Sequence, residues 1–169
     1  MLRVGVIGQG AIAQHVAQGV GGIDAQLALA VIRPGREDAA RNALGRDVTL
    51  TDRITGDLPD IMVDCAGHQG LAAHGAAILR AGVPLVTVSL GALAETGLLD
   101  KLTEAARTGQ TRLILCSGAI GGLDALRAAR TGRLDTVIYT GRKPPQGWAG
   151  SPADRVLEAG VPLSGPVTH

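Results

Sequence analysis

The feature that most constrains this sequence is a short apolar run near its start that ends in a turn of small residues. The run Val4–Ile7 is followed by Gly8-Gln9-Gly10-Ala11-Ile12-Ala13, a Gly-x-Gly-x-x-Ala pattern that opens into a helical segment. In the dinucleotide-binding fingerprint the first glycine makes a tight turn, the second lets a pyrophosphate approach the backbone, and the third small residue lets the helix pack on the sheet. The pattern therefore predicts a strand, a phosphate-binding turn and a helix whose first N–H groups face an anion.

Composition limits the class of protein. Of the 169 residues 46% are hydrophobic and 18% are charged, which suits a globular chain with one well-filled core. A formal net charge of +1 gives no electrostatic reason for a nucleic-acid or membrane partner, and no apolar stretch reaches the roughly 18 residues that span a bilayer. We therefore expect a cytoplasmic protein. Cys65 and Cys116 lack metal-ligand spacing, so we expect free thiols and no metal site.

Apolar strands alternate with helical patterns over residues 1–132, which predicts a Rossmann-like, doubly wound α/β domain with a parallel sheet. Scarce aromatics and abundant Val, Ile, Leu and Ala suit strands that are buried on both faces. Beyond this domain the pattern changes, and Leu134–Thr140 is strand-like. We expect residues 133–169 to form the start of an incomplete α+β second domain.

The second strand, Leu27–Ile32, ends in Arg33-Pro34-Gly35-Arg36. An acidic residue at this place accepts hydrogen bonds from the adenosine ribose in NAD-preferring domains. Here Arg33 and Arg36 replace it, and a guanidinium group matches the oxygens of a 2′-phosphate. The arginines predict that NADP is accepted at least as well as NAD, unless they are only solvated loop charges.

The fourth strand ends in small residues and a histidine, Ala66-Gly67-His68, before a helix expected from about Gly70. Ligands of doubly wound sheets lie beyond the carboxyl ends of the strands, so these three residues, and Ser89 at the end of the fifth strand, are candidate cofactor contacts. His68 either contacts cofactor or substrate or makes a loop-stabilising hydrogen bond. We expect His74 to be buried in the helix and structural.

Three segments together resemble the L-aspartate dehydrogenase family. These segments are Ile7–Ala13, then Asp64–His68 with Val88–Leu93, and finally Ser117–Leu126 with Tyr139–Pro144. The resemblance implies NAD(P)-dependent oxidative deamination of L-aspartate to iminosuccinate, which feeds NAD biosynthesis, and we expect a homo-oligomer. It places the phosphate turn on Gly8, Gly10, Ala11 and Ile12, and a cofactor-contacting alanine on Ala119.

The resemblance assigns no catalytic residue here, because the family's catalytic histidine lies beyond the end of this sequence. Arg142 and Lys143 are candidate partners for the substrate carboxylates. We therefore expect the 169-residue chain to bind cofactor but to be inactive alone. Two alternatives remain open: a relative of homoserine dehydrogenase or dihydrodipicolinate reductase, and a non-catalytic dinucleotide-binding module.

Overall fold

A computed structural model describes residues 1–117 and 122–138. Six parallel strands form one sheet in the order β3-β2-β1-β4-β5-β6. The strands are β1 (Leu2–Ile7), β2 (Ala25–Val31), β3 (Thr49–Thr51), β4 (Ile61–Asp64), β5 (Leu85–Thr87) and β6 (Leu113–Leu115). This order confirms the predicted Rossmann-like sheet, and the chain reverses direction along the sheet between β1 and β4, where such folds bind ligands.

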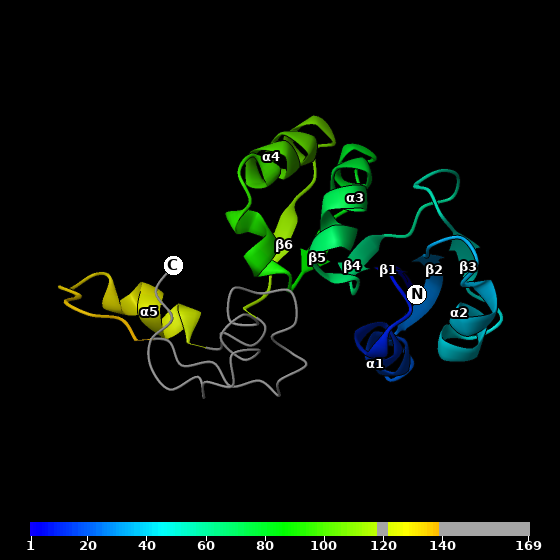
Figure 1. The fold of residues 1–169 in the computed structure, drawn as a ribbon. Coiled ribbons are helices and arrows are strands. Elements are labelled where there is room, and N and C mark those ends of the chain that lie inside the picture. The colour runs from blue at the N-terminus through cyan, green and yellow to red at the C-terminus, as the bar shows by residue number, and fades with distance from the viewer. Residues whose placement is uncertain (118–121, 139–169) are drawn as a thin grey trace, which may run out of the picture. The chain divides into compact units, whose positions relative to one another are not determined.

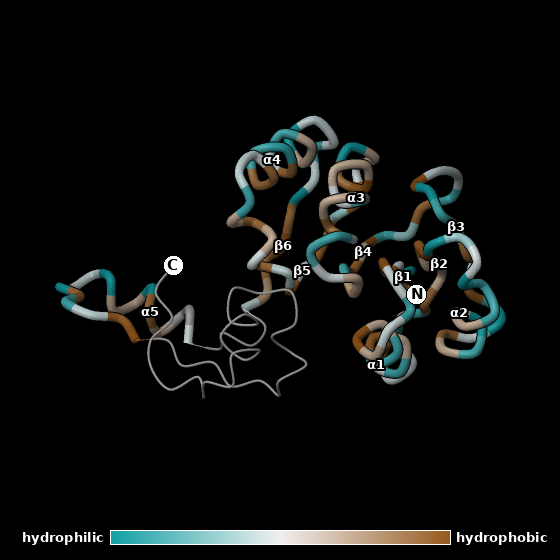
Figure 2. Tube along the Cα trace, viewed as in Figure 1, coloured by the Kyte–Doolittle hydropathy of each residue, from teal (hydrophilic) through white to brown (hydrophobic). Residues whose placement is uncertain are grey.

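Helices cover both faces of the sheet. In Figure 1, α1 (Ala11–Val20) and α2 (Glu37–Leu44) lie on one side of the sheet, and α3 (Gly67–Arg80) and α4 (Leu98–Thr108) lie on the other. On the α3 and α4 side, Leu71, Leu79 and Leu102 are fully buried against the strands. Each such side chain stabilises the fold by about 1.5–3 kcal/mol. In Figure 2, hydrophilic residues dominate the outside of α2, whereas hydrophobic residues lie on the strands.

Two boundaries differ from the sequence-based expectation. Helix α3 begins at Gly67, so Gly67 and His68 lie in its first turn and not in a loop. The expected strand Leu134–Thr140 is wrong over Leu134–Ile138, which is irregular, while residues 139 and 140 lie outside the described part of the chain. A strand needs a hydrogen-bonded neighbour, and within residues 1–117 and 122–138 nothing pairs with this segment.

The chain divides into two compact units, Met1–Ala125 and Leu126–His169. The first contains the whole six-stranded sheet. A short helix, α5 (Leu123–Ala129), crosses the boundary, and the described residues that follow it are exposed. A second domain of α+β type from residue 133 onward stays a prediction. None of the described helices is long and apolar enough to cross a membrane.

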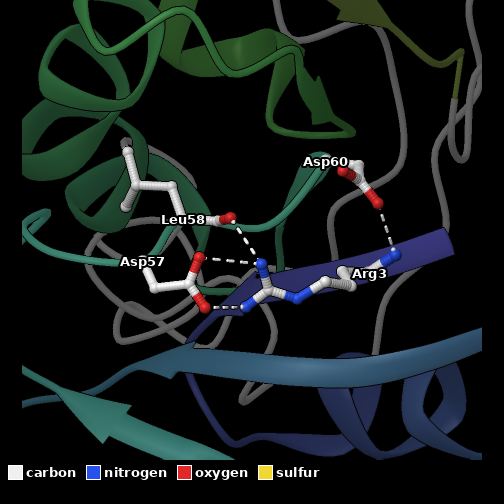
Figure 3. A network of polar contacts seen from close by, with 4 residues as sticks. All are labelled: Arg3, Asp57, Leu58 and Asp60. Atoms are coloured by element: carbon white, nitrogen blue, oxygen red, sulfur yellow. Dashed lines mark hydrogen bonds and ion pairs between the residues drawn. The ribbon is translucent and has the colours of Figure 1, made fainter.

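An ion pair holds the connection between β3 and β4 at the amino edge of the sheet (Figure 3). The guanidinium of Arg3, on β1, donates from Nη2 and Nη1 to the two carboxylate oxygens of Asp57 at 2.7 and 2.9 Å, and Nη1 also donates to the carbonyl of Leu58 at 3.1 Å. The backbone N–H of Arg3 donates to Asp60 at 2.7 Å. The hydrogen bonds and charge of Arg3 lower the pKa of Asp57. This network fixes the segment that carries the chain across to the second half of the sheet.

Candidate cofactor-binding site

A pocket of about 570 Å³ opens at the carboxyl ends of β1, β2 and β4, within the range typical of small-molecule sites. Its walls come from three segments: the turn after β1, the end of β2, and the start of α3. The lining residues are Ile7, Gly8, Gln9, Gly10, Val31, Ile32, Arg33, Arg36, Cys65, Ala66, Gln69, Gly70, Ala73 and His74. Since two arginines and no Asp or Glu line it, the pocket suits an anionic ligand.

The turn after β1 has the geometry that its glycines predict. Gly8 has φ +95°, and its N–H donates to the carbonyl of Val31 at 2.8 Å. An added Cβ at Gly8 would lie 3.2 Å from the Cβ of Ala66, so both the conformation and the packing favour glycine. Gly10 has an ordinary φ of −71°, and an added Cβ there would meet nothing within 4 Å. Glycine at position 10 is therefore not required by packing, and the space in front of it is open to a ligand.

Helix α1 presents an uncapped N-terminus to this space. Gly10 is its N-cap and supplies no side-chain hydrogen bond, and no acidic residue lies in the first turn. The first N–H groups of a helix lack partners within the helix, so they are free to bind a phosphate. Ala11 and Ile12, predicted to contact cofactor, form this first turn. Ala13 is fully buried, as the fingerprint requires for close packing of helix and sheet.

Arg33 and Arg36 lie at the β2 end of the pocket, as the sequence predicted. Both side chains are exposed, and neither forms an ion pair with any of the described residues. The nearby Glu37 accepts a hydrogen bond from the N–H of Gly35 at 3.1 Å. The two guanidinium groups are thus available to an anion at this end of the pocket.

The residues after β4 separate into two groups. Ala66 lines the pocket, whereas Gly67 and His68 are absent from its lining. The imidazole of His68 instead lies against Gly91 in a short 3-10 helix, η1 (Leu90–Ala94), because an added Cβ at Gly91 would be 2.9 Å from His68 Nε2. His74, expected to be buried, is half-buried and lines the pocket. Contact of Gly67 and His68 with a cofactor stays a prediction.

Ser89 is buried, and its hydroxyl donates to the carboxylate of Asp64 at 2.6 Å. Its side chain therefore has a partner inside the protein, and Ser89 is absent from the pocket lining. Contact between Ser89 and the cofactor stays a prediction. Ala119, the remaining predicted contact, lies outside the described residues, as do Arg142 and Lys143.

Cys65 also lines the pocket, and both cysteines are free thiols. Burial, reinforced by the charge of the adjacent Asp64, raises the pKa of Cys65 to about 12. The thiol is therefore protonated near neutral pH and contributes packing, not nucleophilic chemistry. In the part of the chain that the structure describes, no group of three or more His, Cys, Asp or Glu residues could hold a metal ion.

Sequence reasoning missed the wall that α3 contributes, formed by Gln69, Gly70, Ala73 and His74. Their spacing places them on one helical face, which is the signal that could have revealed them. Gly70 allows this helix to approach the sheet, because an added Cβ there would overlap the Cβ of Ala66 and lie 3.4 Å from Ile7. The spacing alone cannot tell which helical face meets a pocket and which meets the core.

The sheet order and the glycine turn before the uncapped start of α1 define a Rossmann-type nucleotide-binding domain. Residues 4–115 match the sequence profile of the family described as "Homoserine dehydrogenase, NAD binding domain". The chain therefore belongs to this family of NAD-binding domains.

Curated relatives confirm the resemblance to L-aspartate dehydrogenases. The L-aspartate dehydrogenase of Ruegeria pomeroyi is 54% identical over 168 residues, an alignment that covers 99% of this chain and 60% of the relative. That of Polaromonas sp. is 43% identical over 163 residues, covering 94% of this chain and 61% of the relative. The chain thus spans about 60% of the length of these curated relatives.

Solved structures share the fold. The aspartate dehydrogenase of Thermotoga maritima matches with a TM-score of 0.55 at 22% identity, covering 78% of this chain and 52% of that protein. The WlbA dehydrogenase of Bordetella pertussis, in complex with NADH and UDP-GlcNAcA, matches with a TM-score of 0.63 at 18% identity. This match covers 89% of this chain and 50% of that protein. At these identities the similarity establishes the fold alone.

Proposed function

We propose that this chain is the cofactor-binding part of an NAD(P)-dependent L-aspartate dehydrogenase, which deaminates L-aspartate oxidatively to iminosuccinate. The observation that carries the proposal is the 54% identity to the Ruegeria pomeroyi L-aspartate dehydrogenase over nearly the whole chain. The site supports it, because the open space at Gly10 and the uncapped start of α1 fit the pyrophosphate of a dinucleotide.

A nicotinamide dinucleotide, when bound, supplies the acceptor for the hydride that leaves the Cα of aspartate. The residues of this chain would hold and orient that cofactor. The turn Gly8–Ala13 would bind the pyrophosphate through backbone N–H groups, and the Arg33 end of the pocket would take the adenosine half. The base that accepts the proton of the amine is not assigned to any residue of this chain.

The proposal is tested by comparing the 169-residue chain with a chimaera that appends the remaining carboxyl-terminal part of the Ruegeria pomeroyi relative. We expect both proteins to bind dinucleotide, and only the chimaera to form NAD(P)H with L-aspartate, measured at 340 nm. Catalysis needs cationic partners for two carboxylates, a base at the amine and near-attack geometry, and an error of about 1 Å costs roughly 100-fold in rate. Exposed ion pairs, worth at most about 1 kcal/mol, would not bind aspartate well without a closed site.

The outcomes of this experiment separate the alternatives. A chimaera that oxidises homoserine in place of aspartate would contradict the proposed substrate. Dinucleotide binding with no turnover of either substrate would favour a non-catalytic module. Robust aspartate turnover by the 169-residue chain would show that this part already contains the base. Light scattering of both proteins tests the predicted homo-oligomer, and a cytoplasmic location also stays a prediction.

We further propose that NADP binds at least as tightly as NAD. Arg33 and Arg36 face the pocket without ion-pair partners in the described residues, so a 2′-phosphate would find two guanidinium groups. Arg33→Asp should weaken NADP binding about tenfold or more, which is about 1.4 kcal/mol. It should leave the affinity for NAD unchanged.

The matched control for this charge reversal is Arg112→Asp. Arg112 is exposed and lies at the opposite, amino edge of the sheet, where its carbonyl accepts a hydrogen bond from the N–H of Leu85. Arg112→Asp changes the net charge by the same amount as Arg33→Asp and should leave the dissociation constants of NAD and NADP unaltered. A wild-type chain that prefers NAD tenfold or more in titration would show that Arg33 and Arg36 are only solvated charges.

A further inference from the structure

Asp64 is a buried carboxylate at the centre of the sheet that the proposed function has not used. It is the last residue of β4, the strand paired with β1, and only 1% of it is exposed. Burying a charged group is costly unless hydrogen bonds or an opposite charge compensate it. The surroundings of Asp64 show which of these compensations the protein supplies.

Three donors from two strand ends converge on this carboxylate. The N–H of Ala66 donates to Oδ1 at 3.1 Å, and the hydroxyls of Thr87 and Ser89 donate to Oδ2 at 2.8 and 2.6 Å. The Thr87 oxygen already accepts the N–H of Ser89 at 3.0 Å, which leaves its own proton directed at Asp64. An ionised carboxylate is an acceptor only, and this set of donors matches it.

The described residues supply no compensating positive charge. No Lys, Arg or His side chain within the described ranges forms an ion pair with Asp64. Among these residues, only hydrogen bonds stabilise the Asp64 carboxylate, in a region of low dielectric where a cation several ångströms away would interact strongly with a negative charge.

Asp64 lies directly beneath the wall of the pocket. Cys65 and Ala66, which follow it, both line the pocket, and an added Cβ on the lining residue Gly70 would be 3.7 Å from Asp64 Oδ1. Arg33 and Arg36 occupy the β2 end of the same pocket. A dinucleotide whose adenosine half lies at the β2 end directs its other half across β1 toward β4 and β5, and so toward Asp64.

We propose that Asp64 makes the site selective for the oxidised cofactor, because its buried carboxylate, which has no ion-pair partner among the described residues, stabilises the cationic nicotinamide ring of NAD⁺ but not the neutral ring of NADH. This inference rests on the proposed function only in that the pocket binds a nicotinamide dinucleotide. The two redox forms have the same pyrophosphate and adenosine, so the ratio of their affinities isolates the charge of the ring. A residue with a purely structural role would change both affinities by the same factor.

The test measures the dissociation constants of NAD⁺ and NADH for the wild-type 169-residue chain, Asp64→Asn and Thr87→Val by calorimetry. Asp64→Asn should weaken NAD⁺ binding by about threefold or more relative to NADH, as expected for loss of a nearby buried charge. Thr87→Val removes two hydrogen bonds of the same network, the one donated to Asp64 and the one accepted from the Ser89 N–H, and keeps the carboxylate, so it should preserve the ratio of the NAD⁺ and NADH affinities.

Circular dichroism verifies that each variant is folded. If Asp64→Asn does not fold, Asp64→Ser removes the same charge, retains a hydroxyl for the network, and should shift the ratio in the same direction. Equal weakening of NAD⁺ and NADH in a folded charge-removing variant would overturn the inference and leave the proposed function intact. Absence of any dinucleotide binding by the wild-type chain would overturn both.

Discussion

Replacing Gly10 by valine separates the ligand requirement at this position from the folding requirement. Gly10 has a φ of −71°, which any residue adopts, and an added Cβ there meets no atom within 4 Å. The branched side chain would instead occupy the space in front of the α1 N-terminus, where the pyrophosphate is expected. We therefore predict that Gly10→Val folds normally and binds dinucleotide poorly.

The size of both effects follows from the structure. Hydrogen bonds to a charged group contribute about 1.5–3 kcal/mol each, so losing one backbone contact to the pyrophosphate should raise the dissociation constant roughly 10- to 100-fold. The free energy of unfolding changes less than the free energy of binding. A poorer N-cap residue typically lowers the free energy of unfolding by about 1 kcal/mol, and replacing glycine restricts the unfolded chain and so raises it by about 0.4–1 kcal/mol. The melting temperature should therefore shift by only a few degrees.

Isothermal titration with NAD and NADP, together with thermal unfolding, measures both quantities. Gly19→Val is the matched control, because Gly19 lies near the other end of α1 and an added Cβ there also meets nothing within 4 Å. This control should bind dinucleotide like the wild type. Unchanged affinity in folded Gly10→Val would refute the assignment of the phosphate site to this turn.

Three further predictions concern other parts of the molecule. Gly70→Ala should lower the unfolding free energy by about 1–3 kcal/mol in denaturant titrations, because the new Cβ overlaps that of Ala66; unchanged stability would contradict this packing. Arg3 lowers the pKa of Asp57, so the stabilising effect of this carboxylate is present above its unfolded pKa of about 4 and is lost as pH falls through the lower folded value. Between about pH 5 and pH 2 the melting temperature of Asp57→Asn should therefore fall less than that of the wild type. If the two melting temperatures fall in parallel with pH, the ion pair does not stabilise the fold. With a pKa of about 12, Cys65 should be alkylated by iodoacetamide at pH 8 much more slowly in the native chain than in denaturant, as peptide mass spectrometry can show; rapid native labelling would disprove its burial.

The parts of the site that could be predicted from sequence are those encoded by adjacent residues. The strand, turn and helix around Gly8 and Gly10 form a local pattern, and Arg33 and Arg36 follow a strand end whose place at the sheet edge is fixed by the fold class. Parallel strand order then brings these segments to one pocket. The turn after β1 and the end of β2 lie together because the topology of the fold determines their proximity. No long-range contact between individual side chains is needed to place them there.

The parts that escaped prediction depend on partners distant in sequence. The hydroxyl of Ser89 is committed to Asp64, 25 residues earlier, and neither residue alone indicates the pair. Helix α3 begins at Gly67 although its glycines lower helix propensity, and at Gly70 it lies so close to β1 that an added Cβ would be 3.4 Å from Ile7, a residue distant in sequence. Leu134–Ile138 has the composition of a strand, but composition cannot supply the neighbouring strand that one requires.

The open space at Gly10 also bears on how related chains can diverge. Gly8, with its positive φ, and Gly70, with its crowded Cα, are retained by the fold whether or not a ligand binds. Position 10 is under no such folding constraint. A descendant that no longer needed the cofactor could accumulate bulky residues there while keeping an intact sheet, so the identity of this single residue would distinguish a working domain from one that survives only as a scaffold.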